Sequence, residues 1–304
     1  MPLPATHRAI VVGVDGSPVS KLAVDWAARN AAMRNTALTV VHIQESPLLT
    51  SGTADPMLTP IPVLPEQMEF LENQGRKILD DALKTVEASM KRSGPVDVTT
   101  ESKTGSPVST LVDMSKNAEM VVVGGRILGR LDRLLLGSVT TGLVHHAHCP
   151  VAVIHDKEPP IPLHPSKGPV VVGIDGSPAS ESATAIAFDE ASRRGVELIA
   201  LHACNDTTAA FEFGDFDWSA VKSQRAELLS ERLAGWQERY PDVLVRRVVA
   251  FNGPARELIE QSEAAQLVVV GSHGRGGFAR MVLGSVSTAV AQSAQAPVIV
   301  ARRP

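Results

Sequence analysis

The chain carries the same pattern twice. The segment Val11–Pro18 returns as Val171–Pro178 with one substitution, so that the residue numbers are offset by 160. Further along, Val121–Gly124 returns as Val268–Gly271, where the offset is 147. A repeat of this length indicates a duplicated domain, because the units of solenoid proteins are about 20–50 residues long. Agreement between the copies therefore marks what the fold or a shared site requires.

Composition narrows the class of protein. The 304 residues suggest two domains, and 44% hydrophobic with 20% charged residues is ordinary for a globular protein. A net charge of −4 argues against sequence-independent nucleic-acid binding, which needs a basic surface. Two cysteines cannot form a disulfide scaffold and fit a reducing compartment. Without a signal peptide or an apolar run of about 20 residues, we expect a cytoplasmic protein with no membrane insertion.

Buried β-branched runs alternate with helical segments in both copies. In the first copy, strands are expected at 9–14, 38–43, 96–100, 120–124 and 151–154, with helices at 18–34, 66–93, 107–117 and 137–146. In the second copy, strands are expected at 170–174, 198–202, 244–250, 266–271 and 298–301, with the long helix at 220–239. This order predicts two tandem doubly wound α/β domains, each with a five-stranded parallel sheet of the Rossmann-like kind.

The predicted domains span residues 1–155 and 169–304. Between them, 156–168 reads as a semi-rigid linker, because it is rich in proline. The second offset is smaller than the first, and the proline-rich loop at 46–65 accounts for most of this difference. Surface loops tolerate such insertions.

A glycine-rich loop follows the fourth strand of the second copy. From Gly271 to Ser285 its spacing is Gly-x2-Gly-x9-Gly-Ser. Glycines let backbone amides converge on a phosphate, and Ser285 would stand at a helix N-terminus, which favours anions. The alternative interpretation is a tight turn followed by a capped helix.

This spacing, an aspartate ending the first strand, and Leu-His-Ala ending the second together resemble the ATP-binding class of universal stress proteins. The tandem-domain members of actinobacteria, including mycobacteria, are especially similar, and the resemblance covers nearly the whole chain. It implies a fold like that of the adenine nucleotide alpha hydrolases and ATP as cofactor, with Mg²⁺ as an optional companion. It also suggests a role in growth control under stress, such as hypoxia or dormancy.

The resemblance places the nucleoside beside the aspartate and the residue after the second-strand histidine, and the phosphates on the glycine loop. In the second copy the implied binding residues are Gly173, Asp175, Ala203, Gly271, Ser272, His273, Gly274, Arg275, Gly276, Gly277, Gly284, Ser285 and Val286. In the first copy they are Gly13, Asp15, Ile43, Gly124, Gly125, Arg126, Gly129, Arg130, Gly137 and Ser138.

The first copy departs from the pattern at Ile127, which stands where the second has Gly274. A β-branched side chain resists positive φ and adds bulk beside a ligand. Either Gly125 and Gly129 allow the loop a shifted path, or the first copy binds nucleotide more weakly.

Several of these residues also have a purely structural interpretation. An aspartate after a strand commonly caps the turn. The loop arginines at 126, 130, 275 and 280 can neutralise phosphate or simply be solvated. His42 and His202, on the second strands, are expected to be satisfied by backbone.

His145, His148 and Cys149 share a helical face in a spacing that can bind metal, but a histidine-rich helix C-terminus is the commoner explanation and no metal site is expected. The sequence contains no P-loop, and no catalytic residues are predicted. Three functions stay open: an ATP-binding regulator with a protein partner or a second copy, an ATPase or adenylate-forming enzyme, and a nucleotide-free scaffold. In the scaffold, the strands 151–154 and 298–301 would pair between the domains.

Overall fold

The computed structural model describes residues 8–45, 65–125, 136–155, 168–203, 218–274 and 283–302. The chain forms two compact units. Unit 1 runs to Gly124 and takes in Gly137–Cys149, whereas unit 2 holds Gly125 and the residues from Pro150 onward. Among the described residues, no helix is both long and apolar enough to span a bilayer.

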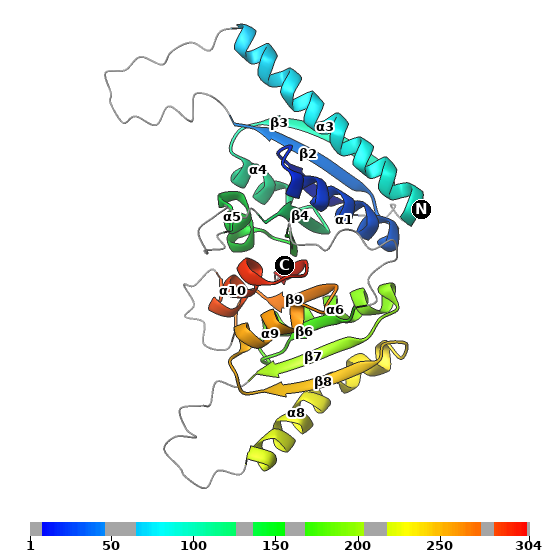
Figure 1. Ribbon diagram of the computed structural model, residues 1–304, viewed down its shortest axis with the longest axis vertical. Coiled ribbons are helices and arrows are strands. Elements are labelled where there is room, and N and C mark those ends of the chain that lie inside the picture. Colours follow the sequence, from blue (N-terminus) through cyan, green and yellow to red (C-terminus); the bar gives the residue numbers. More distant parts are fainter. Residues whose placement is uncertain are drawn as a thin grey trace, which may run out of the picture. The chain divides into compact units, whose positions relative to one another are not determined.

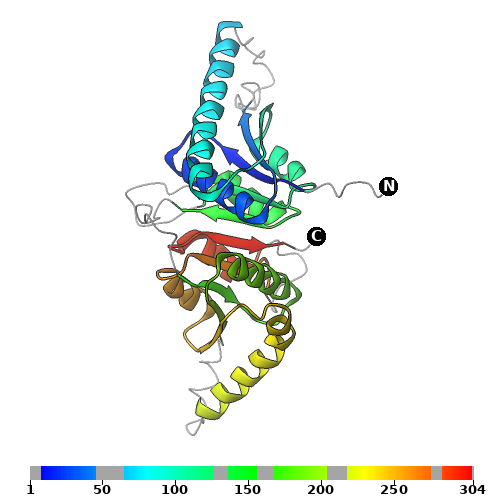
Figure 2. The same cartoon turned by 90° about the vertical axis from the view of Figure 1, so that its right-hand side faces the viewer.

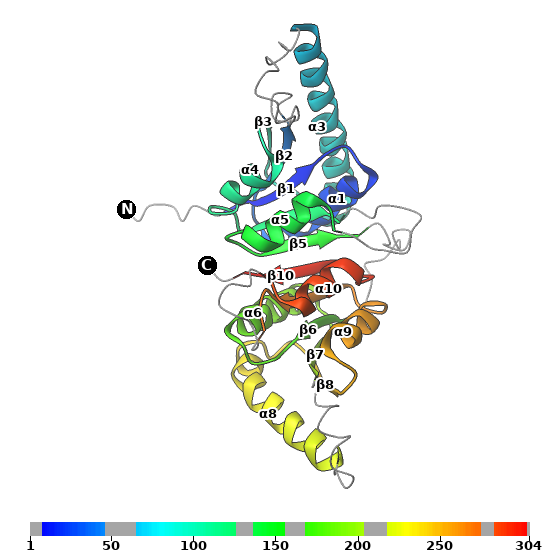
Figure 3. The same cartoon turned by 90° about the vertical axis from the view of Figure 1, so that its left-hand side faces the viewer.

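Unit 1 is a parallel sheet with helices on both faces. Its elements are β1 (Ile10–Val14), α1 (Pro18–Arg34), β2 (Leu38–Gln44), α3 (Pro65–Ser93), β3 (Val98–Thr104), α4 (Pro107–Met114), β4 (Met120–Gly124) and α5 (Ser138–His146). The strand order is β3-β2-β1-β4 (Figure 1). Helices α1 and α3 cover one face, and α4 and α5 the other (Figure 3). The alternating sequence pattern thus gives the predicted doubly wound layers.

The third strand lies further along the chain than predicted. It was expected at 96–100, but β3 runs from Val98 to Thr104 and pairs with β2 residue by residue, from Leu38 to Gln44. Its polar second half resembles a loop in sequence. An edge strand can carry such polar side chains, because its backbone ladder needs only one partner and one side faces solvent.

Unit 2 repeats this arrangement and adds two strands. Its elements are β5 (Val151–Ile154), β6 (Val170–Gly173), α6 (Pro178–Arg194), β7 (Leu198–Ala203), α8 (Trp218–Arg239), β8 (Val245–Ala250), α9 (Pro254–Ser262), β9 (Leu267–Gly271), α10 (Ser285–Ser293) and β10 (Val298–Ala301). The order is β8-β7-β6-β9-β10-β5. In Figure 2, α8 (yellow) and α9 (orange) lie on opposite sides of this sheet.

The last strand of each repeat takes part in one antiparallel pair. Ile299 of β10 lies opposite Ala152 of β5, and this pair stands beside the parallel ladder of β10 with β9. The predicted pairing of these two strands is therefore present. It also explains why β5, expected as the fifth strand of the first domain, groups with unit 2.

The turn after the first strand of each unit brings a helix back over the sheet. Gly16 and Gly176 adopt φ of +80° and +78°, a conformation that favours glycine. Ser17 and Ser177 then cap α1 and α6 by accepting from the amide three positions on. Each turn leaves its aspartate at the carboxyl edge of the sheet, where doubly wound folds bind ligands.

Candidate functional site

Each strand-turn aspartate uses one carboxylate oxygen to hold its turn. The amide of Ser17 donates to Oδ1 of Asp15 at 2.9 Å, and that of Ser177 donates to Oδ1 of Asp175 at 2.8 Å. The turn-capping interpretation is therefore correct in both units. Oδ1 is thus the oxygen that holds the turn in each carboxylate, and Oδ2 is the second oxygen.

In unit 2 this second oxygen faces the glycine loop. A β-carbon built on Gly274 would lie 2.8 Å from Oδ2 of Asp175, closer than real β-carbons approach another atom. A side chain at position 274 would therefore require the Asp175 carboxylate or the loop to shift. The aspartate and the loop, far apart in sequence, belong to one site.

Hydrogen bonds hold the two ends of this loop. The hydroxyl of Ser177 donates to the carbonyl of His273 at 3.1 Å, and the Ser272 hydroxyl lies 3.0 Å from Nδ1 of His273. The amide of Gly284 donates to the carbonyl of Ser272 at 2.8 Å. The start of α10 is therefore tied to the end of β9, beside the Asp175 turn.

The fourth-strand glycines bring a helix close to the sheet. A β-carbon on Gly271 would lie 2.7 Å from the carbonyl carbon of Ala179 in α6, and one on Gly124 would lie 2.8 Å from the side chain of Val19 in α1. Gly13 and Gly173, by contrast, pack against leucines on the opposite face. Close packing alone accounts for glycine at these last two positions.

Helices α5 and α10 begin at the same edge of their sheets. Gly137 and Gly284 occupy the N-cap positions and provide no side-chain cap, unlike the serines that cap α1 and α6. Ser138 and Ser285 are the first helical residues, and Val286 follows as a half-buried residue. First-turn amides that lack a side-chain acceptor are suited to an anion.

The second strands complete this edge. Nδ1 of His42 lies 2.9 Å from the carbonyl of Val14, and Nδ1 of His202 lies 2.7 Å from that of Ile174. Since a carbonyl only accepts, Nδ1 carries the proton in both rings, and the predicted backbone role is confirmed. Ile43 and Ala203 follow these histidines, at the carboxyl ends of β2 and β7.

Part of the predicted phosphate loop lies outside the described residues: Arg126, Ile127, Gly129, Arg130, Arg275, Gly276 and Gly277. Gly125 is described, and its amide donates to the carbonyl of Ile154 at 2.7 Å. Ser272, at the equivalent position of the second repeat, donates in the same way to Ala301 at 3.0 Å. Gly125 thus takes the place of Ser272.

Cys149 is one of the three residues whose spacing can bind a metal, although no metal site was predicted there. This residue is buried, and burial raises the pKa of its thiol to about 12. In the metal-free protein this thiol is therefore protonated near neutral pH. In the described part of the chain, no three His, Cys, Asp or Glu side chains gather in a metal-binding arrangement.

One feature of unit 1 was not predicted from sequence. A cavity of about 550 Å³ lies between the Asp15 turn, α1 and α3. It is lined on the α3 side by residues from Phe70 to Ala82, to which no motif drew attention.

Comparison with known proteins matches both repeats to one family. The model of the Universal stress protein family covers residues 6–155 and 168–302. The chain belongs to the universal stress protein family. This confirms the family and the α/β fold that the sequence pattern predicted.

Similar universal stress proteins span the full length. Universal stress protein Rv2623 of Mycobacterium tuberculosis (strain H37Rv) is 52% identical over 293 residues, which cover 96% of each chain. Universal stress protein Mb2028c of Mycobacterium bovis is 50% identical over 303 residues, which cover all of both. The crystal structure of a universal stress protein from Archaeoglobus fulgidus covers 98% of this chain and 100% of its own, with a TM-score of 0.72. At 19% identity, that structure supports the fold alone.

Proposed function

We propose that this universal stress protein binds ATP at the carboxyl edge of its sheets and acts as a nucleotide-dependent regulator of the stress response. The observation that carries the proposal is the close approach of Gly274 to Asp175, where an added β-carbon would lie 2.8 Å from Oδ2. It joins a hydrogen-bond acceptor suited to ribose or adenine with a loop whose glycines suit phosphate. The uncapped start of α10 adds amides that favour negative charge.

The residues present fit an adenine nucleotide. Asp175 and Ala203 would hold the nucleoside, while Gly271 to Gly274 and the Gly284-Ser285 step would hold the phosphates, with Mg²⁺ as a companion ion. ATP would tie the loop to α10, and a protein partner or a second copy would detect that ordered state in the cytoplasm.

The proposal makes the second repeat the stronger site. At the place of Gly274 the first repeat has Ile127, and in unit 2 even a methyl group there would meet the aspartate. We therefore propose binding rather than efficient catalysis, with any hydrolysis slow and incidental.

The test is nucleotide stoichiometry on the purified chain. Extraction and absorbance should find adenine nucleotide, and calorimetry should give at least one ATP per chain, lost in Asp175→Ala. Asp189→Ala is the matched control, since Asp189 pairs with Arg193 on α6 away from the turn. If no nucleotide co-purifies and ATP leaves the melting temperature unchanged, the proposal is wrong.

A second variant tests the asymmetry of the repeats. Ile127→Gly restores the glycine pattern of the second repeat and should strengthen ATP binding at the first. Radioactive-ATP hydrolysis that is faster than about one turnover per minute and is lost in Asp175→Ala would support the enzyme alternative instead.

A further inference from the structure

We propose that the cavity of unit 1 binds a small organic anion with an apolar body, at a site whose lining differs from the equivalent residues of the second repeat. The cavity lies against the Asp15 turn, between the first turns of α1 and the exposed half of α3. Its volume of about 550 Å³ falls within the range of pockets that hold small molecules, about 300–1,000 Å³. The proposal does not depend on ATP binding.

One small side chain in the cavity wall is replaced by a larger one in the second repeat. Ala82 lines the cavity, and Leu229 stands at the equivalent position of α8, by the second of the two repeat offsets. The equivalence rests on burial: Ala82 and Val86 are buried at the same spacing as Leu229 and Leu233. The second repeat thus has a buried leucine where unit 1 has the small side chain that lines the cavity.

The side chains beside the turn glycine also differ between the two repeats. In unit 2 the guanidinium of Arg232 lies directly against Gly176, and it pairs with Glu181 at 3.6 Å. In unit 1 the corresponding Gly16 faces the side chain of Ile78. An internal ion pair therefore covers the turn in unit 2, where unit 1 has an apolar wall.

Charge at the cavity mouth favours an anion. Lys21 is the counterpart of Glu181, by the first of the two repeat offsets, so the charge at this position is reversed between the repeats. Lys21 and Lys77 line the cavity together with two carboxylates. These are Asp15, whose Oδ1 accepts from the amide of Ser17, and Asp81, which pairs with Lys84 at 2.9 Å. The hydrogen bond from Lys84 and its charge lower the pKa of Asp81, with smaller contributions from Lys21 and Lys77. An additional negative group would complete this cluster.

Apolar side chains in the cavity wall provide a surface for the apolar part of a ligand. Val24 and Ile78 line the cavity together with Phe70, which is 67% exposed. An exposed aromatic ring beside an apolar pocket offers a stacking surface for a planar ligand. Figure 1 shows the N-terminal part of α3 extending beyond the sheet. The combination fits an aryl or acyl carboxylate, sulfonate or phosphate.

The test uses 8-anilinonaphthalene-1-sulfonate, an aromatic anion whose fluorescence rises in an apolar site. Titration of the full chain should saturate at one probe per chain. Ala82→Leu, which copies the second repeat, should weaken binding by at least about tenfold by filling the pocket. Lys77→Gln should weaken it by about three- to tenfold. Lys91→Gln removes the same charge from the same helix, about 20 Å along its axis, and should have no effect.

Three results would overturn the proposal. The first is binding that does not saturate, and the second is equal affinity in wild type, Ala82→Leu and Lys77→Gln. The third is a combination of two results: ATP displaces the probe completely, and Ala82→Leu leaves the affinity for the probe unchanged. The probe would then occupy the nucleotide site. Lys77 is exposed, so its variant keeps the test valid even if Ala82→Leu does not fold. ATP stoichiometry is measured separately, so either proposal can fail alone.

Discussion

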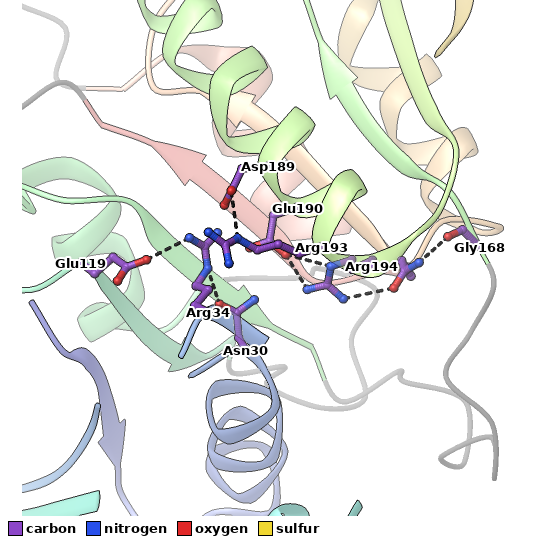
Figure 4. Close-up of polar contacts among 9 residues, drawn as sticks. Asn30, Arg34, Glu119, Gly168, Asp189, Glu190, Arg193 and Arg194 are labelled. Carbon is purple, nitrogen blue, oxygen red and sulfur yellow. Dashed lines mark hydrogen bonds and ion pairs between the residues drawn. The ribbon is translucent and has the colours of Figure 1, made fainter. Parts of the chain in front are cut away.

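At the scale of single residues, one arginine in each repeat ties the first helix to the start of the fourth strand. In unit 1, Arg34 donates from Nε to Oδ1 of Asn30 at 2.8 Å and from Nη1 to Oε1 of Glu119 at 2.9 Å (Figure 4). The side chain of Arg34 is only 10% exposed. Its guanidinium is therefore held between an amide and a carboxylate away from bulk water.

Arg194 is the equivalent arginine in unit 2, and there the amide and the carboxylate acceptor have exchanged positions. Arg194 donates from Nε to Oε2 of Glu190 at 2.8 Å and from Nη1 to Oε1 of Gln266 at 3.1 Å. The two repeat offsets match Glu190 to Asn30 and Gln266 to Glu119. In the hydrogen bonds described above, each arginine thus meets one carboxylate and one amide. A poorly exposed guanidinium needs a countercharge, whereas burying a further carboxylate beside it would add desolvation cost.

This exchange predicts a compensating double substitution. Glu119→Gln should lower the free energy of unfolding by about 1–2 kcal/mol, because Arg34 loses a charged acceptor. Adding Asn30→Glu, which copies unit 2, should restore most of that loss, as measured by urea denaturation in a double-mutant cycle. Glu197→Gln, which breaks an exposed pair with Arg246, is the control and should cost less than about 0.5 kcal/mol. Additive effects of the two substitutions would contradict the exchange.

At the scale of elements, the two helix pairs on equivalent faces are packed differently. Phe188 of α6 is fully buried. Its ring centroid lies 5.9 Å from that of Trp236, in α8, and 5.7 Å from that of Tyr240, which directly follows α8. The equivalent of Phe188 in α1 is Ala28, which is also buried. Small residues let α1 approach α3 closely, whereas aromatic rings fill the space between α6 and α8.

We therefore expect Phe188→Ala to be severely destabilising. The loss should be about 3–5 kcal/mol for unit 2, because the stacked rings of Trp236 and Tyr240 cannot close the cavity that is left. Tryptophan fluorescence and urea denaturation would measure it. Phe70→Ala, the same change at a 67% exposed position, should stay within about 0.5 kcal/mol. Similar losses in the two variants would contradict the packing described.

At the scale of the whole molecule, the last strands of the two repeats join in one antiparallel pair. Val298, Ile299 and Val300 lie opposite Val153, Ala152 and Val151. These residues are fully buried, so the pair is a part of the core rather than an exposed edge. The duplication thus lets one chain pair its own two final strands.

A disulfide across this pair would test that arrangement. In a chain carrying Cys149→Ser and Cys204→Ser, the Ala152→Cys/Ile299→Cys variant should oxidise to a monomeric cross-linked species, because directly opposite residues lie within disulfide reach. Val153→Cys/Ile299→Cys, shifted by one residue, directs the thiols to opposite faces and should not cross-link. Dimers on a non-reducing gel would mean that the strands pair between chains instead.

Much of the fold and part of the site could be predicted from local sequence. Continuous β-branched runs, typical of buried strands, predicted the strand positions within a few residues, and the Asp-Gly-Ser-Pro turns predicted both the cap and the helix start. The polar end of β3 was missed because its ladder depends on β2, a partner distant in sequence. The resemblance placed Asp175 and Gly274 in one nucleotide site, but how closely they approach each other required the fold.

The sequence by itself determined the duplication, the α/β class and the family, since these depend on periodicity and on short motifs that act locally. Only the tertiary structure decided how the copies differ. The cavity of unit 1, the exchanged acceptors of the two arginines and the membership of β5 all depend on side chains or strands that are far apart in the chain. Such contacts leave no local pattern, because the substitution that opens or fills a space lies on one element and its consequence on another.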